Sequence, residues 1–152
     1  MEPTLLQIHG KDISVKTQAI ARLTEGQKAL CMFRVLYDHA KGSVSEYYQW
    51  ISYLLDRPDY WSGVTGGLRF FDDLAMLGLL EETTEVLAAR NCRLGVQWGD
   101  ATFKDLERDR ELLNAASVLF ERFLDIAPNS LKRISTYIRS NPRQFVTIED
   151  GD

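Results

Sequence analysis

The sequence predicts an all-α protein, a single-domain bundle of about six to seven helices spanning residues 1–145. Apolar residues recur at helical spacing over most of the chain, capping residues precede several of these runs, and no segment alternates like a half-buried strand. With 152 residues and 45% apolar content, the chain is long enough to bury a substantial core in one domain. Residues 146–152 are acidic and are expected to form a frayed tail.

Two capping boxes open the first clear helices. Residues 24–27, TEGQ, and residues 43–46, SVSE, both have a hydroxyl residue followed three positions later by Gln or Glu. The first box predicts a helix that ends at Lys41-Gly42, where glycine would accept the left-handed conformation. The second predicts a helix over 44–55, which stops before the Arg57-Pro58 pair because a residue that precedes proline disfavours helix.

The aromatic cluster YYQW at 47–50 suggests two roles, core packing or a stacking platform for a base or sugar. On a helix over 44–55, Tyr48 and Ser52 point away from an apolar stripe that consists of Tyr47, Trp50, Ile51 and Leu54. A stacking platform would need adjacent rings on one exposed face. We therefore predict that this cluster is mainly core.

The middle of the chain predicts a loop followed by a helix. Residues 58–67, PDYWSGVTGG, contain glycine and proline in the pattern of an exposed loop. After a short helix to about Phe71, Asp72 or Asp73 can cap a helix over 74–89. A second loop is expected over 91–100.

The last third of the chain predicts two helices. Thr102 is expected to cap the first, which runs through Leu124 with an apolar stripe near the helical period. Pro128 then occupies a position where proline is favoured in the first turn, so a separate final helix is expected from there. Basic residues near its end complement the helix dipole.

No catalytic, metal or cofactor site is evident from the residues. The only histidines, His9 and His39, have no metal-ligand spacing, and Cys31 would lie about 12 Å from His39 along one helix. Cys31 and Cys92 read as reduced structural thiols. No segment approaches the ~20 uncharged apolar residues of a membrane span. We therefore expect a soluble, cytoplasmic, non-enzymatic protein without a cofactor.

The charges are divided along the chain, although the net charge is only -4 and the isoelectric point is about 5.2. No Lys or Arg lies between Arg69 and Arg90, a stretch that holds the acidic candidates for partner binding: Asp72, Asp73, Glu81, Glu82 and Glu85. Residues 128–145 hold no acid and contain the candidates for nucleic-acid binding: Lys132, Arg133, Arg139 and Arg143. On a helix, the three glutamates share one side, where they repel one another.

Three segments resemble the bacterial family of DNA-mimic-protein-like domains over roughly residues 22–145. Tyr47, Gln49 and Trp50 match its aromatic-Gln-aromatic element, and residues 79–81 match a Leu-Leu-Glu ending. The terminal Tyr-Ile-Arg-x-Asn element falls on residues 137–141. Where the family pattern has Gly-Gly and Gly-Ala, this chain has Ser45-Glu46 and Asp72-Asp73: in these two places it departs from the pattern.

The resemblance implies an all-α bundle, a homodimer and, in the best-understood member, an acidic surface that imitates DNA to occupy a DNA-binding protein. Our first hypothesis is therefore an interaction domain whose acidic face binds a basic or DNA-binding protein. An alternative is an immunity- or antitoxin-like protein that binds through Tyr60 and Trp61, because aromatic residues are enriched at binding hot spots. The second alternative is nucleic-acid binding through the basic C-terminal helix, for which the acidic overall charge is unfavourable.

Overall fold

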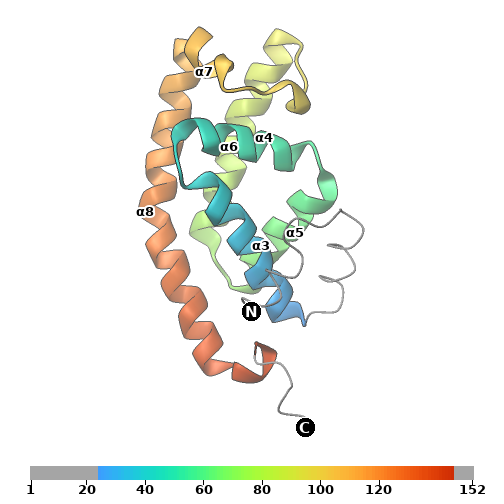
Figure 1. Cartoon of the computed structure of the whole chain (residues 1–152), viewed down its shortest axis with the longest axis vertical. Helices are drawn as coiled ribbons and strands as arrows, with labels where there is room; N and C mark the ends of the chain where they lie inside the picture. The colour runs from blue at the N-terminus through green and yellow to red at the C-terminus, as the bar shows by residue number, and fades with distance from the viewer. Residues whose placement is uncertain (1–23, 146–152) are drawn as a thin grey trace.

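The computed structural model describes residues 24–145 and is all-helical over that range, which confirms the predicted fold class (Figure 1). The predictions for the first 23 residues, including His9, and for the tail over 146–152 lie outside the described residues. Between residues 24 and 145, six α-helices and two short 3₁₀ helices follow one another: α3 (Glu25–Ala40), α4 (Val44–Leu55), α5 (Pro58–Phe70), α6 (Leu74–Leu94), η1 (Trp98–Asp100), α7 (Lys104–Arg108), α8 (Arg110–Ser140) and η2 (Pro142–Gln144).

Three helix starts follow the predicted caps, whereas Thr102, a further predicted cap, does not begin a helix. Thr24 forms a complete capping box with Gln27, and Ser43 accepts a hydrogen bond from the backbone N–H of Glu46. Asp73 caps α6 by accepting from the backbone N–H of Met76. These bonds satisfy backbone donors that have no partner inside the helix.

Gly42 does not have the predicted left-handed conformation. Lys41 ends α3 with φ -78°, and the positive-φ residues of the described chain are Asp72 and Gly95. Gly95 instead closes α6, which runs five residues beyond the predicted end at residue 89.

The predicted loop over 58–67 is wrong, because these residues form most of α5. Pro58 occupies the first turn, where its missing N–H costs nothing. Gly67 faces α3: a Cβ there would lie 3.1 Å from the carbonyl oxygen of Ala29, so glycine permits the two backbones to approach closely. Glycine here serves helix packing rather than a turn, and α5 makes its most extensive contacts with α3.

The expected division near Pro128 is also wrong. The helix predicted to begin at Thr102 consists of a short α7 and then α8, which begins at the Asp109 cap and continues through Pro128 to Ser140. Its buried residues stay in phase across the proline, because Phe123, Ala127, Ser130 and Ile134 recur every three or four positions. Packing of this stripe offsets the hydrogen bond that proline cannot make.

One cluster of buried side chains joins the helices. Tyr47 of α4 lies near its centre, with its ring 5.3 Å from that of Phe123 and its hydroxyl 2.7 Å from the Thr83 hydroxyl. Burial raises the pKa of Tyr47 to about 12 despite the Thr83 hydrogen bond. Figure 1 shows α8 along one side of the molecule, from α7 down to η2.

Candidate functional site

The structure places three of the predicted acidic residues on one exposed face of α6. Glu81, Glu82 and Glu85 are all exposed, and residues three and four apart on a helix are neighbours. Arg122 of α8 donates a hydrogen bond to Glu82, which lowers the pKa of that carboxyl. Glu81 and Glu85 make no ion pair within residues 24–145, so their charges face solvent.

The two predicted aspartates have different surroundings from the glutamates. Asp73 is only 4% exposed, because its carboxylate caps α6, and it is therefore not available to a partner. Asp72 is exposed, and it adopts a left-handed conformation with φ 57° in the turn between α5 and α6. The acidic surface is thus centred on the glutamates of α6.

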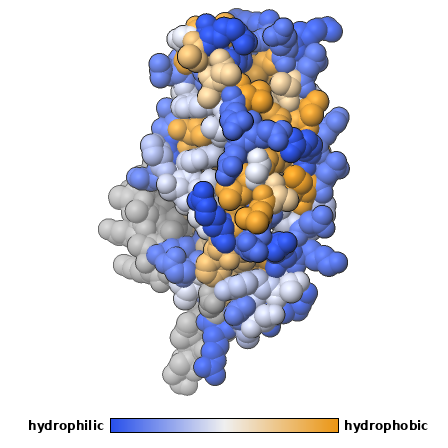
Figure 2. All heavy atoms as spheres, turned by 180° about the vertical axis from the view of Figure 1, so that it is seen from behind, coloured by the Kyte–Doolittle hydropathy of each residue, from blue (hydrophilic) through white to orange (hydrophobic). Residues whose placement is uncertain are grey.

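Apolar side chains are exposed beside these glutamates. Arg90 pairs with Asp109 and Glu82 with Arg122, so α6 and α8 run antiparallel. Val86 lies one turn after Glu82 and Val118 one turn before Arg122, which places both valines at the same level of the α6–α8 seam. They are 37% and 56% exposed. Figure 2 shows apolar patches among hydrophilic side chains on the side of the molecule opposite the view of Figure 1.

The other predicted binding residues occupy two further places. Tyr60 and Trp61 lie in the first turn of α5, partly buried against the core rather than in a loop. The basic candidates lie at the C-terminal end of α8 and in η2, and all four are exposed: Lys132, Arg133, Arg139 and Arg143.

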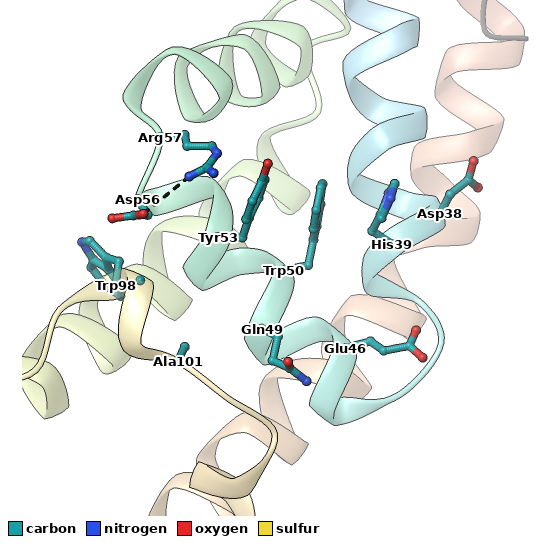
Figure 3. A pocket seen from close by; sticks show the side chains of 11 residues that line it. Asp38, His39, Glu46, Gln49, Trp50, Tyr53, Asp56, Arg57, Trp98 and Ala101 are labelled. Carbon is teal, nitrogen blue, oxygen red and sulfur yellow. Dashed lines mark ion pairs between the residues drawn. The ribbon is translucent and has the colours of Figure 1, made fainter. Parts of the chain in front are cut away.

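A groove between α3, α4 and η1 was missed by sequence reasoning. It is a cavity of about 570 Å³, which lies within the usual range for ligand pockets. Three flat side chains line one wall as a stacked row, the aromatic ladder: His39, Trp50 and Tyr53 (Figure 3). Their centroids are 4.1 and 4.8 Å apart, with planes within 14° of parallel.

The aromatic ladder continues at one end into a cation. The guanidinium carbon of Arg57 lies 4.1 Å from the centre of the Tyr53 ring, and its Nη1 lies 3.5 Å from Asp56 Oδ2. Gln49 also lines the groove, and its amide donates to Ser45 Oγ at 2.9 Å. Trp98 of η1 stands near Asp56 in Figure 3. The prediction that the YYQW cluster is mainly core therefore fails for Trp50, which is only partly buried and lines this groove.

Tyr48 was predicted to point away from the core, but it is buried in a polar clasp. Its hydroxyl donates to Asp105 Oδ2 at 2.6 Å and accepts from Arg90 Nη1 at 3.3 Å. Arg90 Nε donates to Asp109 Oδ2 at 3.1 Å. This clasp ties α4 and α6 to the residues around α7. Burial and the Asp105 carboxylate raise the pKa of Tyr48.

Within residues 24–145, no group of three or more His, Cys, Asp or Glu side chains is arranged to hold a metal ion. Over the same range, no helix has both the length and the apolarity needed to cross a bilayer. Cys31 is buried and Cys92 is exposed, and both are free thiols. No family model, curated protein or solved structure matches the chain.

Proposed function

We propose that the chain is a non-enzymatic interaction domain that binds a basic protein, such as a DNA-binding protein, through the exposed face of α6. The observation that carries this proposal is the placement of Glu81, Glu82 and Glu85 on one exposed helical face. The nearest cations along the chain, Arg69 and Arg90, lie more than a turn beyond either end of this group. Complementary charge speeds association and selects partners.

The exposed valines favour a protein partner. Val86 and Val118 give the acidic face an apolar strip, and protein interfaces typically combine an apolar centre with a polar rim. The acidic face accords with the DNA-mimic role that the family resemblance implies. Duplex DNA has one charge per ~1.7 Å of axis, a density that a net charge of -4 does not reach.

We therefore include a homodimer in the proposal, because two copies of the α6 face side by side would raise the local charge density. Sedimentation of the full chain is expected to give twice the monomer mass of 17.4 kDa. A monomer at micromolar concentration would remove this part of the proposal and leave the acidic face to be tested alone.

The test is capture of partners from the native host by the wild-type chain and by a Glu81→Lys/Glu85→Lys variant. Glu82 is left in place because its loss would also break the contact with Arg122. We expect the variant to lose a basic partner that the wild type releases as salt is raised. An Asp59→Lys/Glu107→Lys variant has the same change in charge at other exposed positions and should retain the partner. Equal capture by both variants would contradict the proposal.

A second candidate function, nucleic-acid binding at the end of α8, is favoured by the exposure of Lys132, Arg133, Arg139 and Arg143. It predicts a gel shift whose affinity falls steeply with salt, and the absence of a shift at low salt would exclude it. The alternative that uses Tyr60 and Trp61 is less favoured, because both rings pack partly against the core. Trp61→Ala should therefore reduce stability more than binding.

A further inference from the structure

The groove beside the aromatic ladder has acidic groups at both of its ends. Asp56 lies at one end with Arg57 and Trp98, while Asp38 and Glu46 lie beyond His39 at the other (Figure 3). Three carboxylates and one guanidinium line the groove, so the lining is negatively charged at neutral pH. This distribution suits a ligand with positive charge at two separated points.

The carboxylate at each end retains capacity for a ligand. Glu46 is exposed and makes no ion pair in the described part of the chain. Asp38, by contrast, is paired: its Oδ2 lies 3.5 Å from Arg34 Nε and its Oδ1 lies 3.9 Å from Lys41 Nζ. At the other end, Arg57 and Asp56 are 3.5 Å apart with side chains 41% and 44% exposed. Exposed ion pairs of this kind contribute little to the stability of the fold, so a ligand cation can share the Asp56 carboxylate with Arg57.

The middle of the groove is apolar, but it does not offer a free ring face between its ends. His39 covers one face of Trp50 and Tyr53 covers the other, with centroids 4.1 and 4.8 Å away. Inserting a flat base between two such rings would need about 7 Å, or two contacts of roughly 3.5 Å each. A flexible alkyl chain needs only to lie along the ring edges and against Trp98. The geometry therefore favours an alkyl chain over a nucleobase.

From these observations, we propose that the groove binds a linear organic cation of the polyamine or agmatine type, with a positively charged group at each end. Its alkyl chain would lie along the aromatic ladder, with one cationic group near Asp56 and the other near Glu46. Cations held close to aromatic rings gain further electrostatic attraction. This ligand site is independent of the protein-binding face proposed on α6.

Calorimetric titration of the full chain tests the proposal with ligands that differ in charge. Spermidine and agmatine have cationic groups at both ends, butylamine has one, and 1,4-butanediol has none. We expect spermidine to bind saturably and about tenfold or more tightly than butylamine, with no binding of the diol. Absence of saturable spermidine binding up to about 10 mM, or equal affinity for spermidine and butylamine, would overturn the proposal.

Variants at the two ends locate the site. Glu46→Gln and Asp56→Asn should each weaken spermidine binding about fivefold or more and remove most of the preference over butylamine. Both side chains are exposed, so the fold should be unchanged by circular dichroism. Glu107→Gln removes an exposed carboxylate outside the groove and should leave binding unchanged. Wild-type affinity in both end variants would contradict the assignment.

A blocked peptide with two arginines distinguishes a free small cation from cationic side chains carried by a polypeptide. Weaker binding of this peptide than of spermidine supports the small ligand. Tighter binding of the peptide, lost in the Glu46→Gln and Asp56→Asn variants, would assign the groove to a polypeptide and overturn the proposed occupant.

Discussion

The imidazole of His39 lies flat against the indole of Trp50, with ring centroids 4.1 Å apart and planes 14° from parallel. The ring nitrogen Nδ1 of His39 is 2.9 Å from the carbonyl oxygen of Val35, so its N–H can donate there and fix the ring. The contact joins α3 to α4 beside the turn between them. It holds Trp50 at the border of the core, where its edge lines the groove.

Replacing His39 with alanine should uncover one face of Trp50. We expect a stability loss of about 0.5–1 kcal/mol, near the lower part of the range for aromatic pairs because His39 is exposed. In a Trp61→Phe/Trp98→Phe background, the emission of Trp50 should also shift to longer wavelength. His39→Phe keeps a ring in place and should restore both properties. Unchanged emission in His39→Ala would show that the stack does not form.

The Tyr48 hydroxyl should be important for stability. Tyr48→Phe removes its bonds to Asp105 and Arg90, both charged partners, and should cost about 1.5–3 kcal/mol in urea unfolding. Tyr60→Phe removes a phenol hydroxyl that takes no part in the clasp, and it should change stability by less than about 0.5 kcal/mol. Equal effects of the two substitutions would argue against the clasp.

Acid should weaken the clasp through Asp109. The hydrogen bond from the Leu112 N–H, followed in size by that from Arg90, lowers the pKa of Asp109 in the folded chain. An aspartate in the unfolded chain has a pKa of about 3.9. The stability that the ionised Asp109 carboxylate contributes to the fold is therefore complete above its pKa in the unfolded chain. It is lost as the pH falls through its lower pKa in the folded chain. Asp109→Asn keeps an N-cap but removes the charge. The gap in urea midpoint between wild type and variant should narrow as the pH falls from 7 through this window, and a constant gap would contradict the assignment.

Pro128→Ala distinguishes a continuous α8 from two shorter helices. Proline within a helix costs about 3 kcal/mol relative to alanine, so the substitution should raise stability by about 1–3 kcal/mol. If Pro128 began a separate helix, alanine would give no such gain. Urea unfolding of the variant decides between the two arrangements.

Sequence reasoning succeeded where the decisive interactions are local. The caps Thr24, Ser43 and Asp73 are recognisable because each bonds to a backbone N–H three residues later. The common face of Glu81 and Glu85 also follows from helical spacing alone. By contrast, α5 was missed because Gly67 packs against Ala29, which is far away in the sequence.

The groove could not be predicted from helical spacing for the same reason. It depends on a ring contact between His39 and Trp50, which belong to different helices, and on Trp98 of η1, which lies much later in the chain. Spacing within α4 assigns Trp50 to the core but does not indicate what covers it. The conformation of Asp72 does agree with a sequence pattern. Asp72 stands where the pattern of the DNA-mimic-protein-like family has glycine, and its φ of 57° is in the region that favours glycine.

The most direct test of the proposed function is a footprint of the captured basic partner on this chain, measured by hydrogen exchange and cross-linking. We predict protection along α6 around Glu81 and Glu85, together with contacts at Val86 and Val118. Protection confined to the first turn of α5 around Trp61, or to the end of α8 around Lys132, would contradict the proposal and assign binding to the aromatic or basic surface instead.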